Sequence, residues 1–490
     1  MQILSNILLF LIPFYVEIFL CFLILLIIYH YLFNINIKLH NDNLSLLNIA
    51  LLSFYTIIII VYFIINDAFI LFFSHKLFSI EFNNLLIKLF LLVQFCILCL
   101  LWPTNKLLAN IRTTYKLLIL LLFIILGLCV AINARDLMLL YIGIELASIP
   151  IYILVSNKEY MVSIEAGIKY YILGAISSCC FLLGISFIYG LTGSTLYNVL
   201  FIYELYVEYL DNYYLYFVFL LIIIIFLFKI GIYPFNFWVT NFNEGASLNI
   251  VFFLAVIPKL PFIYILMLLL FYIFNITLSL QLYIILILII LSFITIFSSI
   301  IEGLSDNHIG RIIGQSSMIN MSFIFIILLC LSVMQESFLF FLFMFYLIPT
   351  LLLFNLISLR DINLTKRDFT AMHDLFTTNN YITLLLYFTL ISLSGLPFLA
   401  GFLGKWYIFE LLIDYNFTLT VIFLVIASIF ANLFYIRLFF YTSSRIRFNN
   451  VKIKQSNYAK YLLLSLLGFI NLSLILLQEP ILGGLFSLYL

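Results

Sequence analysis

The sequence has 490 residues, of which 66% are hydrophobic and only 9% are charged. Soluble domains carry about 25% charged residues, so a soluble globular protein is excluded. The net charge of +1 excludes a basic nucleic-acid-binding protein. Apolar runs of about 20 residues, the length needed to cross a bilayer core, recur from end to end. The fold class expected is therefore an all-α polytopic membrane protein.

Fourteen membrane-spanning helices are predicted from the alternation of apolar runs with charged or turn-forming residues. The first run is too long for the core of a signal peptide and lacks a basic start, so we interpret it as a retained helix. The predicted spans are 4–32, 45–65, 85–102, 116–134, 137–155, 165–190, 215–238, 247–273, 280–301, 312–333, 337–358, 380–413, 418–440 and 460–478.

Loop charge predicts the orientation of these helices. Fourteen Lys and Arg residues follow odd-numbered helices and two follow even-numbered ones, and positive residues favour the cytoplasmic or matrix side. The odd-numbered loops are therefore expected on the negative, matrix-like side, and both termini on the outer side. The loops after helices 11 and 13 carry much of this charge, on Arg360, Lys366, Arg367, Arg445 and Arg447.

The other six basic residues lie inside predicted spans. Lys88, Lys169 and Arg437 are near helix ends, where a long side chain can reach the interface, so we expect structural roles for them. Lys229 and Lys259 lie roughly 18 to 21 Å along their helices at about 1.5 Å per residue, too deep for that explanation. Lys405 lies in the twelfth span.

Glu145 is the most informative acidic residue, because it lies midway along the fifth span among apolar residues. An uncompensated carboxylate there is costly, so it is expected to be protonated or paired. Structural roles are expected for Glu17 and Glu410, which lack a clear basic partner, and for Glu165, which is four residues before Lys169 on a helix.

Two further groups are given structural interpretations. Asp306, His308 and Arg311 are read as a solvated loop cluster that could touch a neighbouring subunit. Cys96 and Cys99 have the spacing of a zinc or redox motif, but no second ligand pair accompanies them, so no metal site is expected.

The seventh and twelfth spans are interrupted by glycine and proline beside a lysine. Such breaks are tolerated in a membrane only where neighbouring groups or water satisfy the freed backbone, and we expect internal water there. Paired broken helices indicate an ion pathway. The residues are Lys229, Gly231 and Pro234 in the first break, and Gly395, Pro397, Gly401, Gly404 and Lys405 in the second.

The two breaks lie five helices apart, an odd offset that predicts an inverted repeat of helices 4–8 and 9–13. The predicted organisation has four parts. They are N-terminal helices 1–3 in residues 1–110, the two repeats in 111–273 and 274–440, and a basic loop with helix 14 in 441–490.

Seven motifs in order carry a family resemblance. They are GIELASIPIYIL, EAGIKYYILGAISS, GISFIYGLTGSTLY, FKIGIYPFNFWV, NEGAS, IPKLP and SGLPFLAGFLGKWYIF. Together they resemble subunit 2 of the mitochondrial respiratory NADH dehydrogenase, complex I, called subunit N in bacteria, one of its antiporter-like membrane subunits. The resemblance runs from about residue 112 to 440.

The resemblance implies roles for four residues in proton translocation. Glu145 matches the family's fifth-helix glutamate, and Lys229 the lysine before the break in helix 7. Lys259 matches the central lysine of helix 8, and Lys405 the lysine of broken helix 12. The family usually has histidine near positions 236 and 320, where this chain has Asn236 and Asn320, which cannot titrate near neutral pH.

The resemblance also implies which cofactors, partner subunits and membrane surround the chain. NADH, FMN, iron–sulfur clusters and ubiquinone would be bound by partner subunits, and this chain would hold no cofactor or metal and perform no redox chemistry. Its partners would be other membrane-arm subunits, including the subunit 4 type and small subunits, with membrane lipids around it. The expected location is the mitochondrial inner membrane.

The expected mechanism is a lysine whose charge is switched by a carboxylate, since burial disfavours the ammonium form and a nearby carboxylate favours it. We expect a half-channel to Glu145 and Lys229, lateral transfer through Lys259, and exit by Lys405. Two alternatives stay open. One is a cation/proton antiporter subunit, and the other is a structural membrane-arm subunit without its own pumping.

Overall fold

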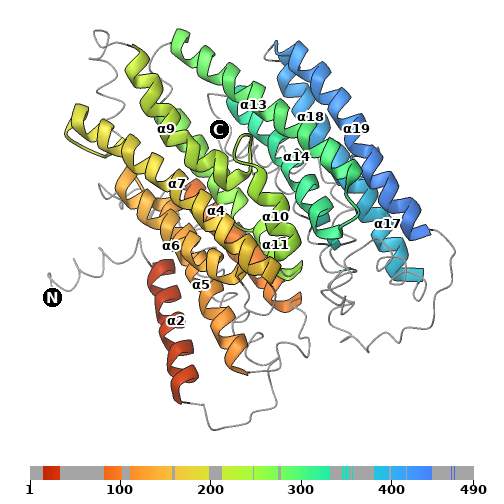
Figure 1. Cartoon of the computed structure of the whole chain (residues 1–490), viewed down its shortest axis with the longest axis horizontal. Coiled ribbons are helices and arrows are strands. Elements are labelled where there is room, and N and C mark those ends of the chain that lie inside the picture. The colour runs from red at the N-terminus through yellow and green to blue at the C-terminus, as the bar shows by residue number, and fades with distance from the viewer. Residues whose placement is uncertain are drawn as a thin grey trace. The chain divides into compact units, whose positions relative to one another are not determined.

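The computed structural model describes most of the chain. It covers residues 15–33, 82–101, 111–156, 161–197, 212–246, 248–273, 278–330, 380–396, 399–414 and 416–443, with single positions between 345 and 356 and at 465 and 468. These described residues are helical, with no strand among them (Figure 1). Within these ranges, seven helices are long and apolar enough to cross a membrane. The polytopic helical class is therefore confirmed. Span 45–65, most of spans 337–358 and 460–478, and the basic loops after helices 11 and 13 lie outside the described residues.

The helices form two compact units. The first unit contains α2 (Tyr15–Phe33), α4 (Phe82–Leu101), α5 (Ile111–Asn133), α6 (Leu137–Val155), α7 (Met161–Thr192), most of α9 (Asn212–Ile230) and most of α12 (Lys259–Ile273). The second contains α10 (Phe237–Gly245), α11 (Leu248–Val256), α13 (Leu278–Ser305), α14 (Ile309–Cys330), α17 (Asn380–Ser394), α18 (Ala400–Asp414) and α19 (Thr418–Ser443).

A hairpin of α5 and α6 forms the centre of the first unit, where α5 also packs against α2 and α4, and α6 against α7 (Figure 1). Small residues line the seam, with Gly127 and Ala131 on α5 facing Gly143 and Ala147 on α6. A β-carbon at Gly127 would lie 2.5 Å from the backbone nitrogen of Ala147. Small residues four apart on both helices let their backbones touch, as in many membrane helix pairs.

The turn between α5 and α6 is held by capping and by a short bridge. The Asp136 side chain accepts a hydrogen bond from the Met138 amide (3.3 Å), as an N-cap does. Tyr197 donates its amide to the Arg135 carbonyl (3.1 Å), next to the isolated bridge between Asp136 and Leu196. This turn fixes the start of α6, the helix that carries Glu145.

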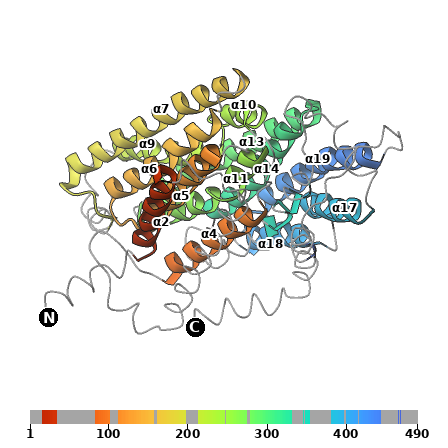
Figure 2. The same ribbon diagram turned by 90° about the horizontal axis from the view of Figure 1, so that it is seen from below.

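In the second unit α14 is central and packs against α10, α11, α18 and α19 (Figure 2). Gly310 and Gly314 on α14 receive Asn243 of α10, and a β-carbon at either glycine would collide with that residue. The glycines therefore let α10 lie against α14. Helices α17, α18 and α19 pack on one another beside it.

The breaks predicted in the seventh and twelfth spans are confirmed, since the seventh is divided into α9 and α10 and the twelfth into α17 and α18. Two other predicted boundaries need correction. The eighth was expected to be continuous, but a turn at Ile257 and Pro258 separates α11 from α12, because a proline ring disrupts the helical hydrogen-bond ladder. Helix α5 begins at Ile111, so Arg112 and Lys116 lie within a helix rather than in a loop.

Candidate functional site

The first broken helix ends at a glycine in the left-handed conformation. Gly231 has φ +89°, and the Ile232 amide donates to the Leu227 carbonyl (2.9 Å), closing the end of α9 as a helix C-cap does. Pro234 follows in the turn before α10. The indole Nε1 of Trp238 then donates to the Phe228 carbonyl (2.9 Å). A side chain from beyond the break thus satisfies a carbonyl that the break would otherwise free.

The second break has the same backbone chemistry. Gly395 has φ +74°, and the Leu396 amide reaches back to the Ile391 carbonyl (3.4 Å). Lys405 Nζ donates to the Ser394 carbonyl at the end of α17 (2.6 Å), where a cation is favoured by the helix dipole. A β-carbon at Gly395 would lie 2.7 Å from Lys405 Cδ, so the glycine also makes room for the lysine.

These contacts modify the expectation that water would take over the broken backbone. At the Phe228 and Ser394 carbonyls the hydrogen-bond donors are Trp238 and Lys405. Side-chain donors are an established substitute for backbone partners at helix breaks in membranes. Sequence spacing missed Trp238, although it stands four residues after Pro234. Pro397 lies outside the described residues.

Lys229 and Lys259 are both 5% exposed. Lys229 Nζ lies 5.4 Å from the centroid of the Phe228 ring, within the range of a cation–π interaction. Lys259 Nζ donates to Ser317 Oγ on α14 (2.9 Å), and Ser317 donates to the Gly314 carbonyl (2.7 Å). Lys259 is therefore a buried amine held by a hydroxyl, at the turn that separates α11 from α12.

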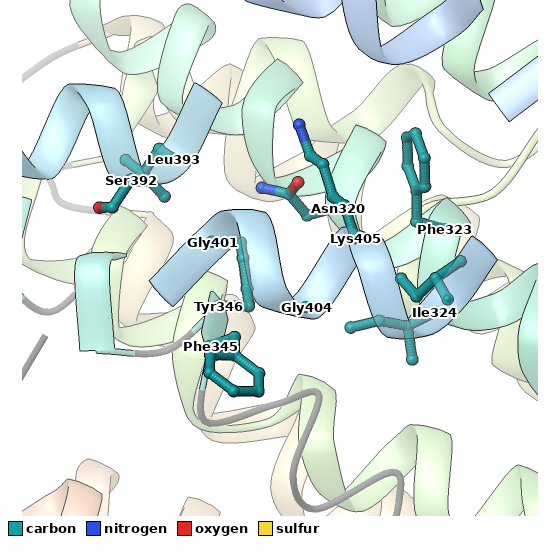
Figure 3. Close-up of a pocket in the computed structure, with 11 residues that line it drawn as sticks. Asn320, Phe323, Ile324, Phe345, Tyr346, Ser392, Leu393, Gly401, Gly404 and Lys405 are labelled. Atoms are coloured by element: carbon teal, nitrogen blue, oxygen red, sulfur yellow. The ribbon is translucent and has the colours of Figure 1, made fainter. Parts of the chain in front are cut away.

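Lys405 borders a cavity of about 40 Å³ in the second unit (Figure 3). Asn320, Phe323, Tyr346 and Ser392 are among the residues that line it. The view shows the Lys405 side chain rising beside Asn320, with the Phe323 ring on its other side, and Nζ is 5.9 Å from the centroid of that ring. A single water needs about 10 to 15 Å³, so this space has room for water beside the polar groups of Lys405, Asn320, Tyr346 and Ser392.

Polar side chains on α14 connect the surroundings of Lys259 with this cavity. Ser317 holds Lys259, and the Tyr346 hydroxyl lies beside Ser317 while facing the cavity, with no well-formed hydrogen bond among the described residues. One turn further along α14, Asn320 lines the same cavity and lies within hydrogen-bonding reach of Tyr435. The row therefore leads from the buried Lys259 toward the partly buried Lys405 inside a single unit.

The two asparagines at the family's histidine positions differ in their surroundings. Asn236 is 4% exposed and its amide donates to Ser298 Oγ (3.4 Å), while its Oδ1 atom is buried without a partner in the described part of the chain. Asn320 lies against the cavity beside Lys405. Both side chains can bind water, and neither can carry the charge that an imidazolium would carry.

Glu145 belongs to the first unit and Lys229 to the second. The carboxylate of Glu145 is partly buried on α6 and accepts a hydrogen bond from Ser148 Oγ (3.0 Å). Among the residues that the structure describes, Glu145 takes part in no ion pair. Its coupling to Lys229 remains a prediction.

The expected locations of two charged residues were wrong. Lys88 is 1% exposed and does not reach the interface, because it is paired with the buried Glu17 at 2.5 Å. Arg311 does pair with Asp306 of its predicted cluster (3.0 Å), but it lies in α14 rather than in a loop, and it also pairs with Glu244 of α10. Arg311 and Glu244 are 67 residues apart, so no local sequence pattern predicts their ion pair.

Lys169 and Arg437, the other two basic residues expected near helix ends, both form polar contacts. Lys169 and Glu165 form the expected surface pair (2.5 Å, four residues apart). Arg437 donates to the Leu304 carbonyl and to Asn307, so it binds the end of α13. In the described ranges no group of three or more His, Cys, Asp or Glu residues is arranged as metal ligands would be.

Sequence comparison identifies relatives of the chain. Residues 134–431 match the family model described as NADH:quinone oxidoreductase/Mrp antiporter, transmembrane. NADH-quinone oxidoreductase subunit N of Pelagibacter ubique is 31% identical over 330 residues, which cover 65% of this chain and 67% of that protein. NADH-ubiquinone oxidoreductase chain 2 of Dictyostelium citrinum is 33% identical over 287 residues, 57% of each chain.

Solved structures share the fold. A chain of respiratory complex I from Thermus thermophilus superposes with a TM-score of 0.70 at 20% identity, over 84% of this chain and 88% of that one. A chain of the membrane-bound sulfane sulfur reductase, an archaeal respiratory membrane complex, superposes with a TM-score of 0.81 at 19% identity, over 96% of each. The resemblance read from the motifs is confirmed, and the chain belongs to the NADH:quinone oxidoreductase/Mrp antiporter family of membrane proteins.

Proposed function

We propose that this chain is a proton-translocating subunit of the membrane arm of an NADH:quinone oxidoreductase. The observation that carries the proposal is the polar row in the second unit, from Lys259 through Ser317 and past Tyr346 and Asn320 to the cavity at Lys405. Buried lysines in a membrane protein are costly and mark ion pathways. Two lysines in one unit, with polar side chains and a water-sized cavity at Lys405 between or beside them, are the arrangement that lateral proton transfer needs.

In this proposal Lys259 and Lys405 exchange a proton through water and hydroxyl groups. Ser317 orients the Lys259 amine, and Tyr346 and Asn320 offer polar atoms to water between the two amines. Lys405 is held at the end of α17 by the Ser394 carbonyl, which favours its charged form. When Lys405 releases its proton, water in the adjoining cavity would donate a hydrogen bond to the Ser394 carbonyl.

Glu145 and Lys229 form the loading end of the route. This assignment rests on the family motifs GIELASIPIYIL and FKIGIYPFNFWV that carry them. The carboxylate would favour the ammonium form of Lys229 when it is close and disfavour it when it is distant. A proton would then pass to Lys259 and leave by way of Lys405.

The energy for transport would come from partner subunits. Moving one charge against 100 mV costs about 2.3 kcal/mol, and NADH oxidation and quinone reduction in the assembly would supply it. NADH, FMN, iron–sulfur clusters and ubiquinone would therefore be bound by those partners, among them other membrane-arm subunits. A mitochondrial inner membrane is the proposed location, supported by the similarity to NADH-ubiquinone oxidoreductase chain 2 of Dictyostelium citrinum.

A cation/proton antiporter is the second candidate, favoured by the match to a family model that also describes Mrp antiporters. Co-purification in mild detergent distinguishes a complex I subunit from an antiporter. A large complex that oxidises NADH supports the proposed function, whereas sodium uptake by vesicles containing this chain without NADH-oxidising partners supports the antiporter. A purely structural subunit would leave the ratio of protons pumped to electrons transferred unchanged in Lys259→Ala and Lys405→Ala variants.

A further inference from the structure

The carbonyl that anchors Lys405 is also contacted by a helix that the proposed route does not use. Ser394 is the last residue of α17, and its carbonyl accepts a hydrogen bond from Lys405 Nζ of α18 (2.6 Å). On α19, the side-chain amide of Asn432 faces this carbonyl and that of Ser428. Carbonyls can only accept, so the amide nitrogen is the atom that faces them, and it donates to both (3.2 Å to Ser428). The two lone pairs of the Ser394 carbonyl therefore have two donors, from α18 and from α19.

The two broken helices differ in how permanent their carbonyl partners are. At the first break the Phe228 carbonyl is bound by the Trp238 indole (2.9 Å), a group that does not change its charge. At the second break one donor is Lys405, which in the proposed route gives up its proton. An ammonium donates a stronger hydrogen bond than a neutral amine. A freed carbonyl inside a membrane needs a partner at every stage, so the second break requires a donor that stays when the lysine changes.

We propose that Asn432 is a positioning residue for Lys405, which keeps the Ser394 carbonyl hydrogen-bonded while the lysine releases its proton. This inference rests on the proposed function. In the release step one N–H bond of the Lys405 ammonium breaks, a water oxygen in the cavity takes the proton, and a neutral amine remains. Asn432 keeps both of its N–H bonds and its place on the carbonyl. Release is therefore easier than it would be if the lysine were the only partner of that carbonyl.

Few groups hold the Lys405 ammonium, so a donor that shares its carbonyl has a direct effect. In the part of the chain that the structure describes, Lys405 takes part in no ion pair. Its two recorded partners are the Ser394 carbonyl (2.6 Å) and the Phe323 ring, whose centroid is 5.9 Å from Nζ. The carbonyl is the shorter and more polar contact. Sharing it with Asn432 weakens the principal hold on the charged lysine.

Helix α19 is held in this place by a second polar contact. Tyr435, one turn after Asn432 and 5% exposed, has its hydroxyl within hydrogen-bonding reach of Ser316 and Asn320 of α14. Asn320 lines the cavity beside Lys405. Helix α19 also packs against α17 and α18 (Figure 1). One turn of α19 therefore contacts both the carbonyl that anchors the lysine and the wall of the cavity that would receive its proton.

Asn432→Leu tests the proposal in the assembled complex, because it removes both donated hydrogen bonds and keeps the shape of the side chain. Proton-coupled turnover in proteoliposomes should fall several-fold, while electron transfer from NADH to an artificial acceptor stays unchanged. The solvent deuterium isotope effect on turnover should increase, since release of the Lys405 proton becomes the slower step. Asn432→Gln keeps the amide and should restore most of the turnover. Thr420→Val is the matched control on α19, because its hydroxyl donates to the Phe417 carbonyl beside its own helix start (2.7 Å).

An asparagine that only joins α17 to α19 would give a different pattern. Asn432→Leu would then pump at the natural rate, or lose turnover with an unchanged isotope effect, and either result overturns the proposal. Should Asn432→Leu fail to assemble, Asn432→Ala takes its place, with the same two expected changes and the same grounds for rejection. Lys405→Ala separates this inference from the proposed function. Pumping that survives Lys405→Ala rejects the whole route, whereas pumping that stops in Lys405→Ala but is natural in Asn432→Leu rejects the role of Asn432 alone.

Discussion

The indole of Trp238 donates a hydrogen bond to the Phe228 carbonyl across the break between α9 and α10 (2.9 Å). The lysine beside that carbonyl, Lys229, is therefore held in a helix end whose backbone is satisfied from within the protein. At the other break the donor is itself a lysine, Lys405, on the Ser394 carbonyl (2.6 Å). At the two breaks, a freed carbonyl therefore receives its hydrogen bond from different donors, an indole and an ammonium.

Replacing Trp238 by phenylalanine should destabilise the break at α9. The change keeps an aromatic ring but removes the donor to the buried Phe228 carbonyl, which costs about 1 to 3 kcal/mol. Thermal inactivation of the solubilised complex should therefore occur at a lower temperature. Trp406→Phe is the control, because Trp406 is 55% exposed on α18. Equal inactivation temperatures for the two variants would show that the indole hydrogen bond does not support the break.

Ser317→Ala should slow proton-coupled turnover several-fold. It removes the hydroxyl that holds the Lys259 amine (2.9 Å), and a hydrogen bond to a charged group contributes about 1.5 to 3 kcal/mol. Electron transfer from NADH to an artificial acceptor should be unchanged, and Ser317→Thr should retain most activity because it keeps the hydroxyl. Ser305→Ala, at an exposed position, is the control. Full pumping in Ser317→Ala would remove Ser317 from the route.

Gly395→Ala should lower both stability and pumping. A residue with a β-carbon in the left-handed conformation costs about 1 to 2 kcal/mol, and the new methyl group would lie 2.7 Å from Lys405 Cδ. Displacement of Lys405 from the Ser394 carbonyl is the expected result. Gly190→Ala on α7 is a matched control, since its β-carbon would meet nothing within 4 Å. The measurements are inactivation temperature and proton uptake into proteoliposomes.

Glu145→Gln and Lys229→Ala should each strongly reduce proton-coupled turnover. If the two residues form one switch, the double variant should be no worse than either single variant, because residues that act as a unit are not additive. Electron transfer to an artificial acceptor should survive in all three. Losses that simply multiply, or pumping that persists in Lys229→Ala, would move the switch to Lys259 and Lys405.

The sequence predicted the class of fold and the two broken helices because apolar length and glycine–proline interruptions are local signals. Gly231 and Gly395 both adopt the left-handed conformation that ends their helices. The turn before Lys259 was missed even though IPKLP contains two prolines, since the surrounding run is continuously apolar.

Residue spacing could not predict which polar residues form pairs between helices that are distant in sequence. Lys88 was assigned to the interface because its span was expected to begin at 85, whereas α4 begins at Phe82 and its partner Glu17 is 71 residues away. Likewise, nothing in the sequence around Lys259 points to Ser317, 58 residues later. Long-range contacts of single polar groups carry no periodicity, so only the folded arrangement reveals them.

The seam of Gly127 and Ala131 against Gly143 and Ala147 limits how Glu145 can move. With the backbones of α5 and α6 in contact, one helix cannot rotate or slide past the other without a collision between main-chain atoms. Two kinds of motion remain for the Glu145 carboxylate. It can rotate about its own side-chain bonds, away from Ser148, or it can move with the whole α5–α6 hairpin as a rigid body. A proton switch built on this residue is therefore either very local or shared by two entire helices.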